Sequence, residues 1–403
     1  MAAAPASAQV TPPTQAFILT LLGDLAGARV ALAASPAGHP GAAVVSVCVE
    51  LEAGDFAAAD ARLQALQRIR PAPPEAAVLR ALVARRRAAP AEPMTVALAE
   101  AWRAAGSPDL SGGDLVALWP KAVLRMLFPL PDATSVARLS AGEAFLLGPV
   151  LAPRPDGDEA IDLAWFDEHS TGAAALAADP AANSTAVNLA LLSWWLEPRD
   201  RAPVLAELRR RLPDDAVMAV IVALRDGSDL EEPEAPLSAA EVEAIESAVR
   251  KPSWTSTTDL IFAEISALTR RVAPAHAALH ARIAHLFVVR LPLLPIHMVY
   301  RAQATVDPAL RARAAAALAA AAGGLKGSGA LLDRMIGLSF AKAALELQGD
   351  TAGAERISDE ARAWLRRLEE PRRRLALHAW PLPSLWREWR PQDEVVTLER
   401  LAR

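Results

Sequence analysis

Hydrophobic positions recur at intervals of three and four residues along much of the chain, which is the spacing that places them on one face of an α-helix. Residues 54–71 read GDFAAADARLQALQRIRP and show this spacing clearly. Their apolar face consists of Phe56, Ala59, Leu63 and Leu66. Gly54 can adopt the positive φ that ends a helix, Asp55 can cap the next one, and Pro71 cannot continue it. The pattern therefore predicts a helix between Asp55 and Pro71.

The same pattern occurs 31 residues upstream. Its positions pair as Gly23-Asp24-Leu25 with Gly54-Asp55-Phe56, Ala28 with Ala59, Leu32 with Leu63 and Pro40 with Pro71. Self-similarity at a fixed period of about 20–50 residues is typical of solenoids. Between the two copies, residues 40–53 carry an apolar face of Val44, Val47, Cys48 and Leu51. We expect this valine-rich segment to form the partner helix of a hairpin, with a strand as the alternative.

The order Gly-Asp-aromatic, small residue, large apolar residue and Pro resembles the second half of a tetratricopeptide (TPR) repeat over about residues 14–71. A third copy lies at Leu347-Gln348-Gly349-Asp350, with Ala354 and Ala361 at the small positions, whereas Ser358 and Arg366 replace the large apolar residue and the proline. The aromatic and Leu-Gly signature of the family's first helix is missing. The resemblance implies a divergent TPR-like α-solenoid that serves as a protein-interaction scaffold.

Composition predicts an all-α fold of helical-hairpin repeats with little or no sheet. The 403 residues are 53% hydrophobic but only 5% aromatic, and alanine, the strongest helix former, supplies much of the hydrophobic fraction. Capping boxes at Ser140–Glu143 and Ser238–Glu241 predict two helix starts. Asp307-Pro308 predicts another helix, which we expect Gly323-Gly324 to end.

Interruptions in the helical pattern predict the domain limits. The acidic stretch DGSDLEEPEAP has no periodicity and is the clearest of them. We expect a disordered N-terminus over residues 1–13, a TPR-like helical array over 14–225, an acidic Pro-containing linker over 226–236, a C-terminal helical region over 237–370 and an Arg/Trp-rich tail or cap over 371–403.

The net charge and the cysteine content argue against several classes of binding site. The net charge of −5 provides no overall basic field that would attract nucleic acid, and Cys48 as the only cysteine excludes an intrachain disulfide or a multi-cysteine metal site. The most apolar window, residues 283–300, contains two His, an Arg and two Pro, so we expect no membrane span. Ala-Ser-Ala-Gln near the start resembles a signal-peptidase site, but no basic and apolar regions of a signal peptide precede it, and arginine far outnumbers lysine. We expect a cytoplasmic bacterial protein, or a periplasmic one if the true start lies upstream.

Among the catalytic and metal-binding motifs that the sequence could contain, one histidine pair supports an alternative to the scaffold function. His276 and His280 are spaced i, i+4, so one helical face can present both to a zinc ion, although Ala-Ala-Leu between them excludes the metalloprotease motif. Residues 323–329 are glycine-rich but lack the P-loop order, and no G-x-S-x-G occurs. We therefore expect no catalytic, cofactor-binding or metal-binding residues. The alternative is an α-helical enzyme, or a metal- or cofactor-binding protein, that uses His276 and His280.

Trp380, Trp386 and Trp389 alternate with Arg387 and Arg390 near the C-terminus. Trp and Arg are typical interface hot-spot residues, but a solenoid also needs its apolar end covered. The tail therefore either docks a partner or caps the fold. We predict a non-enzymatic scaffold or adaptor that binds a protein partner, as a subunit of a bacterial complex, with these five residues as candidate interaction residues.

Overall fold

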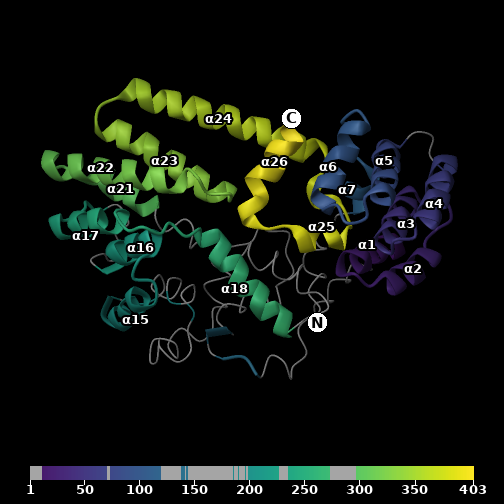
Figure 1. Ribbon diagram of the computed structural model, residues 1–403, viewed down its shortest axis with the longest axis horizontal. Helices are drawn as coiled ribbons and strands as arrows, with labels where there is room; N and C mark the ends of the chain where they lie inside the picture. Colours follow the sequence, from purple (N-terminus) through teal and green to yellow (C-terminus); the bar gives the residue numbers. More distant parts are fainter. Residues whose placement is uncertain are drawn as a thin grey trace, which may run out of the picture. The chain divides into compact units, whose positions relative to one another are not determined.

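The computed structural model describes residues 11–69, 73–118, 138–140, 142–143, 185, 189, 196, 198–226, 235–272 and 296–403. Within these ranges the regular elements are helices, and the β-contact is an isolated bridge between Asp215 and Ser253 (Figure 1). The all-α prediction is confirmed. The first helix begins at Pro12, inside the segment predicted to be disordered, because proline is pre-organised for the first helical position.

The chain forms two compact units. Unit 1 comprises Met1–Pro129, Leu368–Trp389 and Thr397–Arg403, and unit 2 comprises Leu130–Arg367 and Arg390–Val396. Most of the C-terminal tail thus belongs with the N-terminal helices. The predicted linker 226–236 falls within the bounds of unit 2, and its residues 227–234 lie outside the described ranges. The predicted boundary there stays a prediction.

Unit 1 begins with helical hairpins that follow one another along the chain. Its N-terminal helices are α1 (Pro12–Leu22), α2 (Leu25–Ala33), α3 (Pro40–Glu52), α4 (Phe56–Ile69), α5 (Pro74–Ala88), α6 (Met94–Ala104) and α7 (Asp114–Leu118). α1 packs on α2, α3 on α4 and α5 on α6 (Figure 1, purple to blue). The valine-rich segment is therefore a helix, α3, and not a strand. Pro71 lies outside the described residues.

The remaining helices complete unit 1 and form unit 2. They are α15 (Pro198–Arg211), α16 (Ala216–Asp226), α17 (Ala239–Val249), α18 (Thr257–Val272), α21 (His297–Ala304), α22 (Pro308–Leu325), α23 (Leu331–Leu347), α24 (Thr351–Arg374), the 3-10 helices η3 (Leu377–Ala379) and η4 (Pro391–Asp393), α25 (Pro383–Glu388) and α26 (Glu394–Ala402). Within unit 2, α22 packs along α23, and α17 packs on both α16 and α22.

The Gly-Asp turns adopt one conformation in three hairpins. Gly23, Gly54 and Gly349 have φ of 81°, 74° and 79°. In each turn the glycine N–H donates to the carbonyl three residues earlier, and the aspartate N–H donates to the carbonyl five residues earlier, at 2.9–3.1 Å. These are the two hydrogen bonds of a Schellman motif, which requires the left-handed conformation that glycine adopts without strain.

The aspartate after each glycine caps the next helix. Oδ1 of Asp24, Asp55 and Asp350 accepts a hydrogen bond from the N–H three residues later at 2.8, 2.9 and 2.8 Å. The small residues that follow, Ala28, Ala59 and Ala354, are 0%, 0% and 2% exposed. The third copy therefore shares the turn and the buried small position with the first two copies. It differs from them at the later positions, Ser358 and Arg366.

Replacing Ala59 by Leu is expected to lower the free energy of unfolding by about 1–3 kcal/mol, because the new side chain would overpack a fully buried position on α4, which packs on α3. Thermal unfolding followed by circular dichroism measures the change. Ala57→Leu is the matched control, since Ala57 is exposed on the same helix. Equal melting temperatures for the two variants would contradict the assignment of Ala59 as the buried small position of α4.

The predicted end of α22 at Gly323-Gly324 is wrong, because the helix continues to Leu325. A Cβ atom on Gly324 would lie 2.2 Å from the indole ring of Trp254, so this glycine allows a close approach and does not end the helix. Gly329 is constrained in a similar way, because a Cβ atom there would lie 1.7 Å from the backbone oxygen of Gln392. Packing thus explains Gly324 and Gly329, whereas a Cβ atom on Gly323 or Gly327 would meet no atom within 4 Å.

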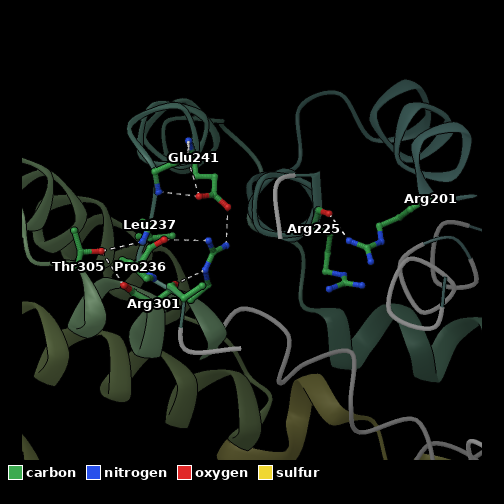
Figure 2. Close-up of polar contacts among 9 residues, drawn as sticks. Arg201, Arg225, Pro236, Leu237, Glu241, Arg301 and Thr305 are labelled. Atoms are coloured by element: carbon green, nitrogen blue, oxygen red, sulfur yellow. Dashed lines mark hydrogen bonds and ion pairs between the residues drawn. The ribbon is translucent and has the colours of Figure 1, made fainter. Parts of the chain in front are cut away.

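Two buried arginines bind backbone carbonyls near the two ends of the predicted linker (Figure 2). Arg201 of α15 donates to the carbonyl of Arg225, in the last turn of α16, at 2.7 Å. Arg301 of α21 donates from Nε to the carbonyl of Ala235 at 2.9 Å, and its Nη1 lies 2.7 Å from Oε1 of Glu241 on α17. The latter contact has the distance of an ion pair but not the angles of a hydrogen bond.

The predicted capping boxes are both present. The Ser140 N–H donates to Glu143 at 2.8 Å, and the Glu143 N–H donates to the Ser140 hydroxyl at 3.3 Å. Ser238 and Glu241 repeat these two bonds at the same distances. Glu241 therefore caps the start of α17 and pairs with Arg301 at the same time.

Candidate interaction site

The three tryptophans of the tail lie in the interior of unit 1. Trp380, Trp386 and Trp389 are 1%, 5% and 9% exposed. The indole N–H of Trp380 donates to the Leu375 carbonyl at 2.9 Å, and that of Trp386 donates to the Trp380 carbonyl at 3.1 Å. Leu382 is also buried. This burial favours the capping alternative, and a role of these residues in partner binding stays a prediction.

Polar contacts join the tail to the N-terminal helices of unit 1. Glu52, at the end of α3, accepts hydrogen bonds from the N–H and the hydroxyl of Ser384. Its side chain is only 4% exposed. Burial raises the pKa of the Glu52 carboxyl, and the bonds from Ser384 oppose that rise. On α6, the N–H of Thr95 donates to Glu388 at 3.2 Å. The tail thus meets α3 and α6 through specific bonds as well as apolar packing.

The two arginines of the tail are exposed but belong to different compact units. In unit 1, Arg387 Nη2 lies 3.7 Å from Oε2 of Glu52, and the Arg387 side chain is 64% exposed. In unit 2, the Arg390 guanidinium lies over the ring of Phe262, 5.6 Å from its centroid. Because the three tryptophans are buried, the tail does not present alternating Trp and Arg side chains on one surface.

The histidines of the alternative function, His276 and His280, lie outside the described residues, so this hypothesis stays untested. Over the described ranges, no group of three or more His, Cys, Asp or Glu side chains is arranged to hold a metal ion. None of the helices in those ranges combines the length and apolar character that crossing a membrane requires. Cys48 is buried, and burial raises the pKa of its thiol.

A pair of carboxyl groups with raised pKa values lies in unit 2. Asp333 of α23 is 2% exposed and accepts hydrogen bonds from the hydroxyls of Thr258 at 3.0 Å and Ser328 at 3.1 Å. Burial raises the pKa of Asp333. Burial, followed by the nearby charge of Asp333, raises the pKa of Asp259 to about 6. Perturbed carboxyl groups occur at active sites and in structural networks alike, and the hydroxyls that satisfy Asp333 fit the structural role.

Asp259→Asn is expected to stabilise the protein at pH 7.5 by about 1 kcal/mol, a value reduced for the partial exposure of Asp259, and to have little effect near pH 4. Because the folded-state pKa of Asp259 is raised, its contribution to stability is fully present below about pH 4 and is lost as the pH rises through about 6. Denaturant unfolding at several pH values measures the difference. A variant whose pH dependence matches that of the wild type would contradict the prediction.

A groove with a volume of about 420 Å³ lies between α23 and α24 in unit 2. Its apolar lining includes Met335, which is 37% exposed, and the half-buried Leu338, Ile357 and Leu365. Two cationic side chains, Lys342 and Arg362, also line it. We call it the α23–α24 groove. The hairpin that forms it contains the third Gly-Asp turn.

A second groove, of about 400 Å³, is formed by α15, α16 and α17. Leu208, Met218 and Val222 contribute apolar surface, and Arg209 and Lys251 contribute positive charge. We call it the α15–α17 groove. Both grooves are therefore lined by apolar side chains together with two cationic side chains.

Sequence reasoning did not identify either groove. On α24, the i, i+4, i+8 spacing of Ile357, Ala361 and Leu365 was available as a signal for an apolar stripe. Such a stripe usually predicts burial, however, and nothing in the spacing indicates that the facing helix leaves it partly uncovered. No protein-family model matches the chain, and no curated protein or solved structure matches it either.

Proposed function

We propose that this protein is a non-enzymatic, TPR-like helical-repeat adaptor that binds another protein as part of a bacterial complex. The observation that carries the proposal is the α23–α24 groove, where a hairpin with the recurrent Gly-Asp turn leaves apolar side chains partly exposed between its helices. Exposed apolar surface rimmed by polar residues is typical of protein-interaction sites. Helical arrays commonly use such surfaces to bind partners.

The chemistry of the grooves also supports binding over catalysis. Their described lining residues are aliphatic side chains, serines, a proline and a few cations, and include no histidine, cysteine or carboxylate. General acid–base catalysis most often uses a histidine or a carboxylate, and a serine or lysine nucleophile needs an adjacent base or a lowered pKa to become reactive. An apolar surface with a cationic rim is suited instead to burying the side chains of a partner.

Co-purification from cells that naturally express the protein tests this proposal. We expect tagged wild-type protein to retain a partner and Leu338→Glu to lose it, because a carboxylate would enter the apolar lining of the groove. Ala363→Glu is the control, since Ala363 is exposed on α24 and does not line the groove. Equal retention by both variants would contradict a role for the groove. Elemental analysis showing one tightly bound metal per chain would favour the His276/His280 alternative.

A further inference from the structure

The charge lining the α23–α24 groove has one sign. Lys342 of α23 and Arg362 of α24 are both cationic, and no carboxylate is among the described lining residues. The α15–α17 groove repeats this arrangement with Arg209 and Lys251. The chain as a whole has a net charge of −5, so the cationic side chains that line the grooves do not follow from the average composition.

The cations of the α23–α24 groove are accessible to a partner. Lys342 Nζ lies 3.4 Å from Glu346, and Arg362 Nη2 lies 2.6 Å from Asp359, in pairs one helical turn apart. The side chains of Lys342 and Arg362 are 46% and 69% exposed. Exposed ion pairs within one helix contribute little to stability, so carboxylates of a partner can replace them with little loss.

The apolar lining of the groove extends over about two helical turns. Ile357 and Leu365 are eight positions apart on α24, which corresponds to about 12 Å at the rise of an α-helix. Met335 and Leu338 line the α23 side. An amphipathic helix laid in a groove presents its own apolar residues at i, i+3 or i+4, and i+7, which cover the same length. The shape and the apolar lining therefore fit a helical ligand.

We propose that the α23–α24 groove binds an acidic amphipathic helix of a partner protein. Its apolar residues would contact the leucine, isoleucine and methionine side chains of the groove, and its carboxylates would pair with Lys342 and Arg362. A basic helix would bury the same apolar surface but place like charges against these two residues, which disfavours it. This inference rests on the proposed adaptor function and specifies the chemical class of the partner.

Synthetic peptides test the proposal on the full-length protein. The first probe is a labelled amphipathic helix of about five turns, with leucine on one face and glutamate on the other. A second carries lysine in place of every glutamate, and a third is a scrambled form of the first without an apolar face. Fluorescence anisotropy at low salt is expected to show binding of the first probe at least about tenfold tighter than either of the others. Added salt should reduce this preference.

Groove variants locate the binding. Lys342→Glu combined with Arg362→Glu is expected to weaken binding of the acidic probe at least about tenfold and to favour the basic probe. Arg356→Glu combined with Arg367→Glu, at exposed positions of α24 outside the groove lining, makes the same change in net charge and should leave binding unchanged. Ala361→Trp should block the groove for all probes while circular dichroism shows the helical fold intact.

Equal binding of acidic and basic probes, or equal effects of the two charge reversals, would overturn the proposal. It would also be overturned if no probe bound, or if the protein dimerised through this groove and the acidic probe did not displace the second copy. In each of these cases, loss of the co-purified partner by Leu338→Glu would still support the adaptor function. Retention of the partner by Leu338→Glu would contradict the adaptor function separately.

Discussion

Trp380→Ala is expected to lower the free energy of unfolding by about 3–5 kcal/mol, the usual loss for removing a large buried aromatic side chain. Trp380 is 1% exposed in unit 1, and its indole N–H donates to the Leu375 carbonyl. The substitution therefore creates a cavity and leaves a buried carbonyl without its donor. Chemical denaturation followed by circular dichroism measures the loss, and hydrogen exchange should place it in the N-terminal helices of unit 1.

Two further substitutions separate capping from docking. If the tail caps unit 1, Trp386→Ala and Trp389→Ala should each destabilise the protein, since both side chains are buried. If the tail docks a partner, the same variants should lose the partner and keep their stability, because a truncated hot-spot residue acts on binding. Arg387→Ala is the matched control for stability alone, because the side chain is mostly exposed and its ion pair with Glu52 is long. Unchanged unfolding of all three tryptophan variants would contradict the packing of the tail in unit 1.

Arg301→Met is expected to lower the free energy of unfolding by about 3–5 kcal/mol, because it leaves the Glu241 carboxylate buried without its cation. Arg301 and Glu241 are 4% and 7% exposed. The substitution also removes the donor to the Ala235 carbonyl that precedes α17. Adding Glu241→Gln should recover part of the loss, since the remaining buried group is then neutral. A double-mutant cycle in denaturant measures the coupling.

The effect of Arg301→Met should depend on pH. Burial raises the pKa of Glu241, but the Arg301 guanidinium and the bonds from Ser238 outweigh burial and hold that pKa below its ordinary value. A carboxyl group with a lowered folded-state pKa stabilises the fold above its unfolded pKa and loses that contribution as the pH falls through the folded value. The penalty of Arg301→Met is therefore largest near neutral pH and shrinks in acid. A pH-independent penalty would indicate that lost packing, and not the charge, dominates.

The Gly-Asp turn can be predicted from the sequence because the hydrogen bonds that stabilise it join residues only a few positions apart. The Schellman bonds at Gly54 reach back no further than Glu50, and the cap of Asp55 reaches forward only to Ala58. Residue identity within about two turns therefore decides the conformation. The capping boxes and the all-helical class are predictable for the same reason, since they depend on residues close in sequence. The turn at Gly349 likewise forms although later positions of that repeat diverge.

Gly324 shows a feature that neighbouring residues in the sequence do not predict. Gly324 has the residue type of a helix terminator, but α22 continues past it, and the indole of Trp254 lies close against this position. Nothing near Gly324 in the sequence indicates that contact. Whether a glycine stops a helix or admits a neighbour depends on what lies against it, which is a property of the folded chain.

The candidate surfaces were decided by tertiary structure alone. Ser384 bonds to Glu52 across 332 positions of sequence, so the choice between a capping and a docking tail depends on a contact that no local pattern encodes. The grooves have the same origin. Apolar spacing on α24 predicts which side chains share a face, but the separation of α24 from α23 determines whether that face is covered. Helix faces follow from residue periodicity, whereas their exposure follows from how whole helices pack.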